Sequence, residues 1–292
     1  LEQFDVAIDE RGVLALLAEG WREPRDPVAI EPLDDPTLIG PLALVGWEQS
    51  EFTSGTPLDV TLLWESTSPI DTQLNTSLQL VAEDGSRIVQ ADGPPARGIL
   101  PANLIFDQPV PDFKRLDIPS DLASGRYRLE LSVYDVETTT PLAEPLPIAW
   151  FRVGPAPASP DEAVGITWNE PIELVGLDTL PKTVRPADMF RVRLVWQVTG
   201  HVDDDFTAFL HLVDDEGVPI AQNDTKPGGA FYPSSAMIIG DTIESIHPLS
   251  IPADSPDGLY RLIVGLYLPE NGQRLSVEGN DHLELGHIEI AP

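Results

Sequence analysis

The sequence contains no cysteine, and basic residues are scarce: 17 Lys and Arg stand against 48 Asp and Glu, for a formal net charge of −31. The absence of cysteine excludes disulfides, thiol nucleophiles and cysteine-ligated metals. The shortage of basic residues excludes the positive surface that nucleic acid or an anionic membrane would require. We interpret the acidic charge as a source of solubility, and keep a cation-attracting surface as the alternative.

Long apolar runs are missing as well. No run reaches the roughly 18 residues of a membrane-spanning helix, so we expect no membrane insertion of this segment. The chain starts at Leu1 without Met or a basic leader, and we expect it to be a part of a larger protein. The hydrophobic content of 42% is that of a globular protein, so the 30 prolines indicate an all-β protein with many turns rather than disorder.

A long internal repeat is the strongest positive signal. Residues 118–129 read IPSDLASGRYRL, and residues 251–262 read IPADSPDGLYRL. Trp64 and Trp196 keep the same offset of about 130 residues, which is the size of a domain and too long for a solenoid unit. Further pairs at this offset are Gln90 with Gln222, Asp92 with Asp224, and Tyr134 with Tyr267. The sequence therefore predicts two related domains in tandem.

Each repeat has the pattern of a β-sandwich with about seven short strands. In residues 60–64, VTLLW, apolar side chains alternate with the period of two that marks a half-buried strand. Asp84-Gly85 lies between two apolar runs and predicts a hairpin. Tyr127 and Tyr260 resemble the tyrosine corner of immunoglobulin domains. We predict an all-β fold of two tandem Ig-like β-sandwich domains.

Composition and pattern divide the chain into four segments. Residues 1–39 are predicted to be an N-terminal extension with a hairpin, although 13–18 would also suit a short helix. Residues 40–154 form the first sandwich. Residues 155–165 are a stiff, Pro-rich linker. Residues 166–292 form the second sandwich.

No catalytic residue is predicted. The sequence has no Gly-x-Ser-x-Gly elbow, and its five histidines are scattered. His211 lies on an apolar strand with no partner that the sequence can name, so we interpret it as structural. With 48 acidic residues, close carboxylate pairs arise by chance and are no evidence for a glycosidase.

Two acidic clusters are weak metal candidates: Asp203, Asp204 and Asp205, and Asp214, Asp215 and Glu216. Their oxygens are the ligands that calcium prefers, and calcium is the one cofactor they would support. The clusters flank the strand 206–213, which spans about 25 Å when extended, so they should lie at opposite ends of the domain. We interpret them as solvated turns and predict no cofactor.

Exposed aromatic side chains would be needed for sugar binding. Trp47, Trp168, Phe231 and Tyr232 are the candidates, and Phe231 and Tyr232 follow the loop Pro227-Gly228-Gly229, where an exposed ring is plausible. The alternative, which we favour, is that these rings plug the ends of the sandwiches. Phe231 and Tyr232 are the predicted ligand residues if a sugar binds.

The second repeat resembles a known family through the order of several segments. These are Trp196, FLHLVDDEG at 209–217, AQND at 221–224, FYPSS at 231–235 and GLYRLIVGLY at 258–267. The order is similar to the β-sandwich region at the extracytoplasmic C-terminal end of bacterial multi-pass membrane proteins, often glycosyltransferases of the dolichyl-phosphate-mannose mannosyltransferase type in Chloroflexi-like bacteria. The match covers most of 170–280 and, more weakly, 43–153. It departs at Ser235-Ala236-Met237, where such segments carry a polar residue and then Trp.

The resemblance implies a non-catalytic module on the cell surface, because the transferase chemistry of such proteins belongs to their membrane portion. We therefore expect an extracytoplasmic interaction or spacer module, not an enzyme, with a protein or glycan as partner. The first alternative is a carbohydrate-binding module that uses loop aromatics, with calcium assistance. The second is a hydrolase whose site the sequence does not show.

Overall fold

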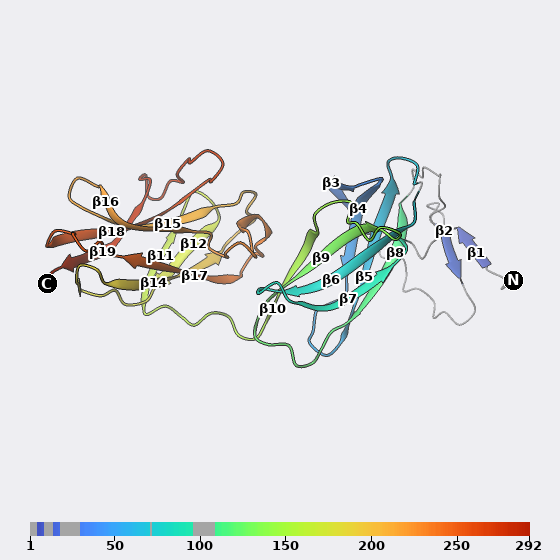
Figure 1. The fold of residues 1–292 in the computed structure, drawn as a ribbon, viewed down its shortest axis with the longest axis horizontal. Coiled ribbons are helices and arrows are strands. Elements are labelled where there is room, and N and C mark those ends of the chain that lie inside the picture. Colours follow the sequence, from blue (N-terminus) through green and yellow to red (C-terminus); the bar gives the residue numbers. More distant parts are fainter. Residues whose placement is uncertain (1–4, 9–13, 18–29, 71, 96–108) are drawn as a thin grey trace. The chain divides into compact units, whose positions relative to one another are not determined.

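The computed structural model describes residues 5–8, 14–17, 30–70, 72–95 and 109–292. The chain divides into two compact units, unit 1 (Leu1–Gly154) and unit 2 (Pro155–Pro292). Each unit consists of β-strands arranged in two main sheets, so the predicted all-β sandwich fold is confirmed (Figure 1). In the part of the chain that the structure describes, no helix is long and apolar enough to cross a membrane.

The two sheets of unit 1 have the strand orders β3-β4-β5-β8 and β10-β9-β6-β7, and every neighbouring pair is antiparallel. The strands are β3 (Pro32–Ile39), β4 (Leu42–Gln49), β5 (Pro57–Ser66), β6 (Leu74–Ala82), β7 (Arg87–Gly93), β8 (Val110–Asp117), β9 (Gly125–Asp135) and β10 (Leu146–Val153).

The two sheets of unit 2 have the orders β11-β12-β14-β17 and β13-β19-β18-β15-β16. The strands are β11 (Glu162–Thr167), β12 (Ile172–Leu177), β13 (Thr183–Val184), β14 (Met189–Val198), β15 (Thr207–Val213), β16 (Pro219–Thr225), β17 (Thr242–Ser250), β18 (Gly258–Tyr267) and β19 (Leu283–Ile290). The order β9-β6-β7 of unit 1 therefore recurs as β18-β15-β16, and β4-β5-β8 recurs as β12-β14-β17.

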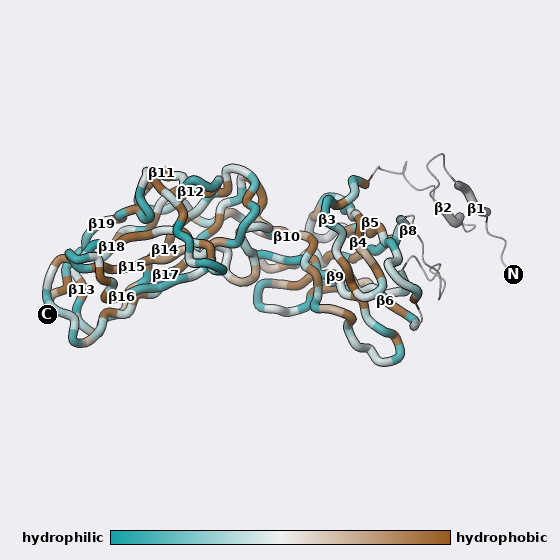
Figure 2. The backbone as a smooth tube through the Cα atoms, turned by 90° about the horizontal axis from the view of Figure 1, so that it is seen from above, coloured by the Kyte–Doolittle hydropathy of each residue, from teal (hydrophilic) through white to brown (hydrophobic). Residues whose placement is uncertain are grey.

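The residues that define the repeat lie where an Ig-like sandwich needs them. Trp64 and Trp196 are fully buried, each in the central strand of its sheet. The hydroxyl of Tyr127 donates to the Ala123 carbonyl at 2.8 Å, and that of Tyr260 donates to the Pro256 carbonyl at 2.9 Å. Both are tyrosine corners, in which the ring is buried and the hydroxyl bonds to the chain four residues upstream. Figure 2 shows hydrophobic residues concentrated along the strands.

Two boundaries differ from the prediction. The strand β3 belongs to the first sandwich, so that domain begins before residue 40, because β3 pairs with β4. The strand β11 begins at Glu162, inside the predicted linker 155–165, because it pairs with β12. In the N-terminal extension, β1 (Asp5–Ile8) and β2 (Leu14–Leu17) pair antiparallel as the hairpin interpretation requires, and the predicted turn lies outside the described residues.

A buried polar group lies between the two sheets of unit 1. The Asp112 carboxylate on β8 accepts a hydrogen bond from the Thr76 hydroxyl at 2.9 Å and lies 3.4 Å from the Lys114 Nζ. Both charged side chains are almost completely buried, with exposed fractions of 1% and 6%. Burial lowers the pKa of Lys114, and the negative charge of Asp112 partly offsets this. The charge on Lys114 is therefore stabilised as long as the Asp112 carboxylate stays close to it.

The equivalent positions on β17 of unit 2 carry a neutral group. Ser245 and His247 pair with β14 as Asp112 and Lys114 pair with β5. The Trp196 indole donates to the Ser245 Oγ at 2.8 Å, and Ser245 Oγ lies 2.9 Å from His247 Nε2. The Asn223 carbonyl lies 3.4 Å from His247 Nδ1 and can only accept, so the neutral ring carries its proton on Nδ1 and accepts from the Ser245 hydroxyl at Nε2.

Candidate functional site

The predicted sugar-binding aromatics do not form an exposed platform. Tyr232 is fully buried, and its hydroxyl accepts the Ile238 N–H at 2.9 Å. Phe231 is half-buried. Trp168 is buried against Trp196, with ring centroids 5.5 Å apart. The proposal that Tyr232 offers a ring face to a sugar is therefore corrected: its ring plugs the domain, because its hydroxyl has a backbone partner inside.

Trp47 also belongs to a domain interior. It is half-buried and packs against the core of unit 1. Trp47, Trp168 and Tyr232 therefore serve packing, whereas Phe231 is half-buried.

In the first acidic cluster, Asp203–Asp205, one residue has a structural role and the other two are exposed. Asp203 and Asp204 are exposed. Asp205 Oδ1 accepts from the backbone N–H of Ser235 at 3.2 Å and from its hydroxyl at 2.8 Å, and Oδ2 lies 3.5 Å from Lys226 Nζ. Burial alone would raise the pKa of Asp205, but the bonds from Ser235 and Lys226 outweigh it and lower that pKa. Asp205 thus anchors the loop that carries Phe231 and Tyr232.

The second acidic cluster forms the turn between β15 and β16. Asp214 Oδ1 accepts the Val218 N–H at 2.8 Å, whereas Asp215 and Glu216 are exposed. Across the described ranges, no group of three or more His, Asp or Glu side chains is placed to hold a metal ion. The two clusters lie at the two ends of β15, so the six acidic residues do not combine into a calcium site.

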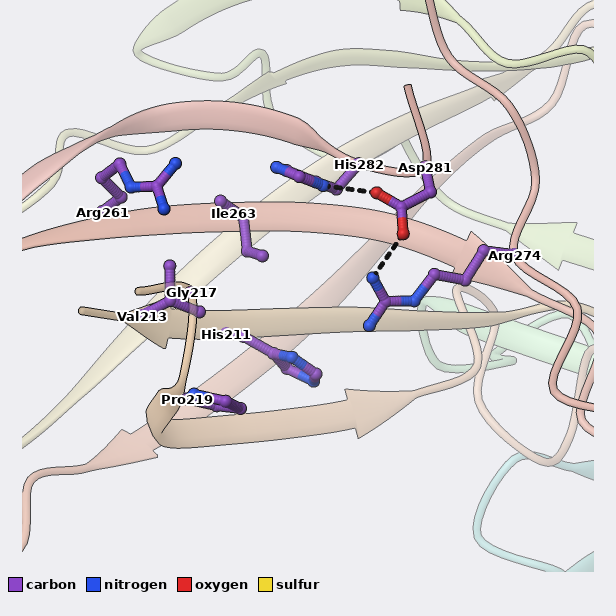
Figure 3. Close-up of a pocket in the computed structure, with 9 residues that line it drawn as sticks. All are labelled: His211, Val213, Gly217, Pro219, Arg261, Ile263, Arg274, Asp281 and His282. Atoms are coloured by element: carbon purple, nitrogen blue, oxygen red, sulfur yellow. Dashed lines mark hydrogen bonds and ion pairs between the residues drawn. The ribbon is translucent and has the colours of Figure 1, made fainter. Parts of the chain in front are cut away.

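A pocket lies on the outer face of the sheet that contains β15, β16 and β18 (Figure 3). It is an open depression of about 230 Å³. It is lined by His211, Val213, Gly217, Pro219, Arg261, Ile263, Arg274, Asp281 and His282. Alternation along β15 explains this placement. Leu210 and Leu212 are fully buried in the sandwich core, so His211 and Val213 point to the opposite, outer face of the sheet.

The pocket lies beside a small aromatic cluster on the same outer face. Phe209 is 1% exposed although it does not face the sandwich core, and it packs with Val213, Ile263 and Tyr267. The Arg274 guanidinium carbon lies 4.4 Å from the centroid of the Phe209 ring, a cation–π geometry. The loop that follows β18 therefore covers the ring.

Gly265 makes room for that ring. It pairs with Phe209 across β15 and β18, and a Cβ built on it would lie 2.3 Å from the Phe209 Cζ. It would also lie 3.0 Å from the backbone oxygen of Asp281. The glycine is thus required by close approach, since its φ is not in the left-handed region.

Two polar chains border the pocket. In the first, His211 Nε2 lies 3.0 Å from Asp224 Oδ1, and the Tyr267 hydroxyl donates to Asp224 Oδ2 at 3.2 Å. Burial, followed by the Asp224 charge, raises the pKa of Tyr267, so its hydroxyl stays protonated as a donor. The histidine that the sequence left without a partner thus has one, 13 residues along the chain on the neighbouring strand.

In the second chain, Asp281 joins a histidine and an arginine. Its Oδ1 lies 2.6 Å from His282 Nδ1, and its Oδ2 accepts from Arg274 at 2.8 Å (Figure 3). The bond with His282, and then that with Arg274, lower the pKa of Asp281. Asp281 therefore stays ionised and holds both side chains at the rim.

Arg261 is the most loosely held polar residue of the pocket. Its Nη2 donates to the Asp214 carbonyl at 3.4 Å, and its Nη1 lies 3.9 Å from Glu284. Both distances exceed the usual range of a hydrogen bond. Most of its five N–H groups are therefore available to a ligand.

The same face of unit 1 has a different character. Ser77 pairs with Asp92 and Ser132 on the flanking strands, as Phe209 pairs with Asp224 and Gly265. The aspartate is kept, but a serine replaces the phenylalanine and another serine replaces the glycine. At the position of His211 unit 1 has Gln79, and at that of Ile263 it has Glu130. Unit 1 therefore lacks, at these described positions, the residues that form the aromatic cluster of unit 2.

We expect the Gly265→Ala substitution to destabilise unit 2 by about 1–3 kcal/mol, because the added methyl forces the Phe209 ring out of its position. A glycine-to-alanine change without a clash has the opposite sign. Ser132→Ala, at the same place in unit 1, is the control and should change stability by less than about 0.5 kcal/mol. Urea unfolding measures both, and equal effects would contradict the packing described.

Comparisons with known proteins do not assign the chain to a family. No family model matches the chain, and no curated protein matches it. Among solved structures 230 chains match, one of which is a glycosyl hydrolase family 2 member from Bacteroides cellulosilyticus. That match has 11% identity and a TM-score of 0.25, and covers 80% of this chain and 27% of that one. A likeness of that size carries no argument about function. The class that the fold defines is a tandem of two Ig-like sandwiches.

Proposed function

We propose that the chain is a non-catalytic interaction module whose ligand-binding face is the pocket on β15, β16 and β18 of unit 2. One observation carries the proposal: two repeats of one fold share their core and differ on this face. The Phe209 ring packs against Gly265, where a side chain would clash with it, and lies under the Arg274 guanidinium. A spacer needs neither the aromatic cluster nor the pocket, so the difference favours binding.

A hydrolase is the second candidate, and the His211–Asp224 pair is what favours it. A histidine oriented by a carboxylate is the base–orienter unit of nucleophilic catalysis. The residues that line the pocket include no Ser, Thr, Cys or Lys to serve as its nucleophile. Asp281 is held by Arg274 and His282. Binding therefore accounts for more of the geometry than catalysis.

The cellular location of the module and the role of unit 1 belong to the same proposal. The resemblance of the second repeat to extracytoplasmic sandwiches supports a place outside the cytoplasm, in a larger protein. The net charge of −31 is consistent with a soluble surface module. Unit 1 would then act as the support and spacer for unit 2.

Thermal unfolding in the presence of neutral sugars, carboxylates and short peptides tests the proposal. A ligand present at 100 times its dissociation constant should stabilise the protein by about 2.7 kcal/mol. We expect one class to stabilise the wild type and Gln79→Ala, but not His211→Ala. These two substitutions occupy the same position in the two repeats. A flat panel, or stabilisation that survives His211→Ala, would contradict the proposal.

A further inference from the structure

We propose that the pocket of unit 2 binds one uncharged sugar ring of hexose size. This inference rests on the proposed function, because it names the ligand of the same site. It does not involve the loop aromatics Phe231 and Tyr232. It follows from the size of the pocket, its apolar patch, and the balance of donors and acceptors at its rim.

The size of the pocket limits the ligand to a single ring. Its volume is about 230 Å³, and it is partly open to solvent. Pockets for drug-sized molecules measure roughly 300–1,000 Å³. An open depression below that range accommodates one ring of a chain that continues into solvent. The terminal or side residue of a glycan has this form.

The apolar patch suits the C–H face of a sugar. Val213, Ile263 and Pro219 line the pocket together with the ring of His211. A pyranose has hydroxyls around its edge and C–H groups on its face, so it can bury the face while its hydroxyls meet the polar rim. Small-molecule sites commonly combine an apolar lining with a few placed polar groups.

The two histidines at the pocket are each held by a carboxylate. A carboxylate accepts hydrogen bonds only, so the ring nitrogen that faces it carries a proton. His211 faces Asp224 with Nε2, and His282 faces Asp281 with Nδ1. The second nitrogens, Nδ1 of His211 and Nε2 of His282, are the ring atoms left to meet a ligand, and the Asp281 carboxylate is the acceptor of the rim.

The two arginines present donors. Among the described residues, Arg261 makes long contacts with Asp214 and Glu284, and Arg274 uses one of its N–H groups for Asp281. The rim thus offers donors and acceptors side by side. Each sugar hydroxyl both donates and accepts, so it satisfies this mixture.

An anionic ligand fits less well. It offers acceptors alone, which match the donors of Arg261 and Arg274 but are repelled by the Asp281 carboxylate beside them. Asp224 and Glu284 add negative charge next to the rim, and the whole chain carries −31. Long-range repulsion therefore acts against an anion and leaves a neutral sugar unaffected.

The test is an NMR titration of the full-length, ¹⁵N-labelled chain with methyl glycosides of glucose, galactose, mannose and N-acetylglucosamine. Sodium acetate and inorganic phosphate are the anionic probes. We expect the amide signals of Val213, Ile263 and His282 to shift with at least one glycoside, with a dissociation constant in the millimolar range typical of one small ring.

Arg261→Ala and Arg128→Ala form a matched pair, because Arg261 and Arg128 occupy the same position in the two repeats. We expect Arg261→Ala to weaken glycoside binding about tenfold, since it removes hydrogen bonds from a charged donor. Arg128→Ala should leave the dissociation constant unchanged. A similar loss in both variants, or shifts away from the pocket, would overturn the inference.

The anionic probes separate this inference from the proposed function. Shifts at the pocket with acetate or phosphate, and none with a glycoside, would overturn the sugar assignment and leave an interaction module with a different ligand. Silence at the pocket with every probe, together with a flat unfolding panel, would overturn both.

Discussion

The Asp112→Ala variant is expected to lose about 3–5 kcal/mol of stability in unit 1, because it leaves the ammonium of Lys114 buried without its counter-ion. The two remaining contacts of Lys114 Nζ, with the carbonyls of Thr76 and Gly93, are long, at 3.4 and 3.3 Å. They cannot replace a carboxylate. Urea unfolding followed by hydrogen exchange of the unit 1 core strands measures the loss.

The second repeat supplies the control for this variant. Ser245 and His247 occupy the positions of Asp112 and Lys114 without any formal charge. The double substitution Asp112→Ser with Lys114→His copies that pair into unit 1. It should recover most of the lost stability, and the serine should also give the buried Trp64 indole N–H a partner, which it lacks among the described residues. A double variant as unstable as Asp112→Ala would contradict the assigned role of the pair.

Acid should remove about 3 kcal/mol of stability from unit 2 through His247. Burial lowers the pKa of this histidine from 6.5 to about 4, against the opposing effects of the Asn223 carbonyl and the Asp224 charge. The unfolded chain takes up a proton near pH 6.5 and the folded chain does not, so this contribution is complete above pH 6.5. It is lost progressively as the pH falls to about 4.

The comparison of wild type with His247→Gln isolates that effect from the many carboxylates that titrate in the same window. The free-energy difference between the two proteins should shrink as the pH falls from about 6.5 to about 4 and then level off. As a control, the free-energy difference between the two proteins should not change with pH above about 7. A difference that stays constant across the whole range would show that His247 is not held neutral in the folded chain.

The fold was predictable because its determinants are local and repeated. The tyrosine corners need only a Tyr and a carbonyl four residues earlier. The turn at Asp84-Gly85 needs only its own residues: Gly85 has a φ of 83°, and Asp84 accepts the Ser86 N–H. The ends of the domains were less well predicted, because β3 and β11 are defined by their pairing with β4 and β12.

The site was not predictable from single residues, because it is assembled across strands. His211 meets Asp224 through the β15–β16 hairpin, and Arg274 reaches Phe209 from the loop after β18. One signal was available: Asp92 and Asp224 matched in the repeat, and the alternation of the strands places Phe209 beside Asp224. A comparison of the outward-facing residues at matching positions of the two repeats would have indicated that this face of unit 2 differs from that of unit 1.

For Tyr232 the sequence left two interpretations. The loop, rich in Pro and Gly, suited an exposed ring, and the favoured alternative was a ring that plugs the end of the sandwich, which is what the buried ring of Tyr232 does. The reason lies in tertiary contacts that the sequence does not express. The chain at Gly228 approaches so closely that a Cβ there would lie 2.2 Å from the Tyr232 backbone oxygen, and the Tyr232 hydroxyl accepts the Ile238 N–H.

The two repeats share their core and differ on one outer face of the sandwich. The buried tryptophans and the tyrosine corners are common to both units. The outward face of β15 and β18 is not. If this face is the binding site, then restoring the residues of unit 1 should remove binding without removing the fold.

The most direct test is the triple variant Phe209→Ser, His211→Gln and Gly265→Ser, which gives unit 2 the residues of unit 1 at these positions. Its ligand-induced rise in unfolding temperature would be compared with that of the wild type, for the ligand that stabilises the wild type most. We predict that the variant folds, shows a cooperative transition, and gains nothing from the ligand. The same rise in both proteins would contradict the account.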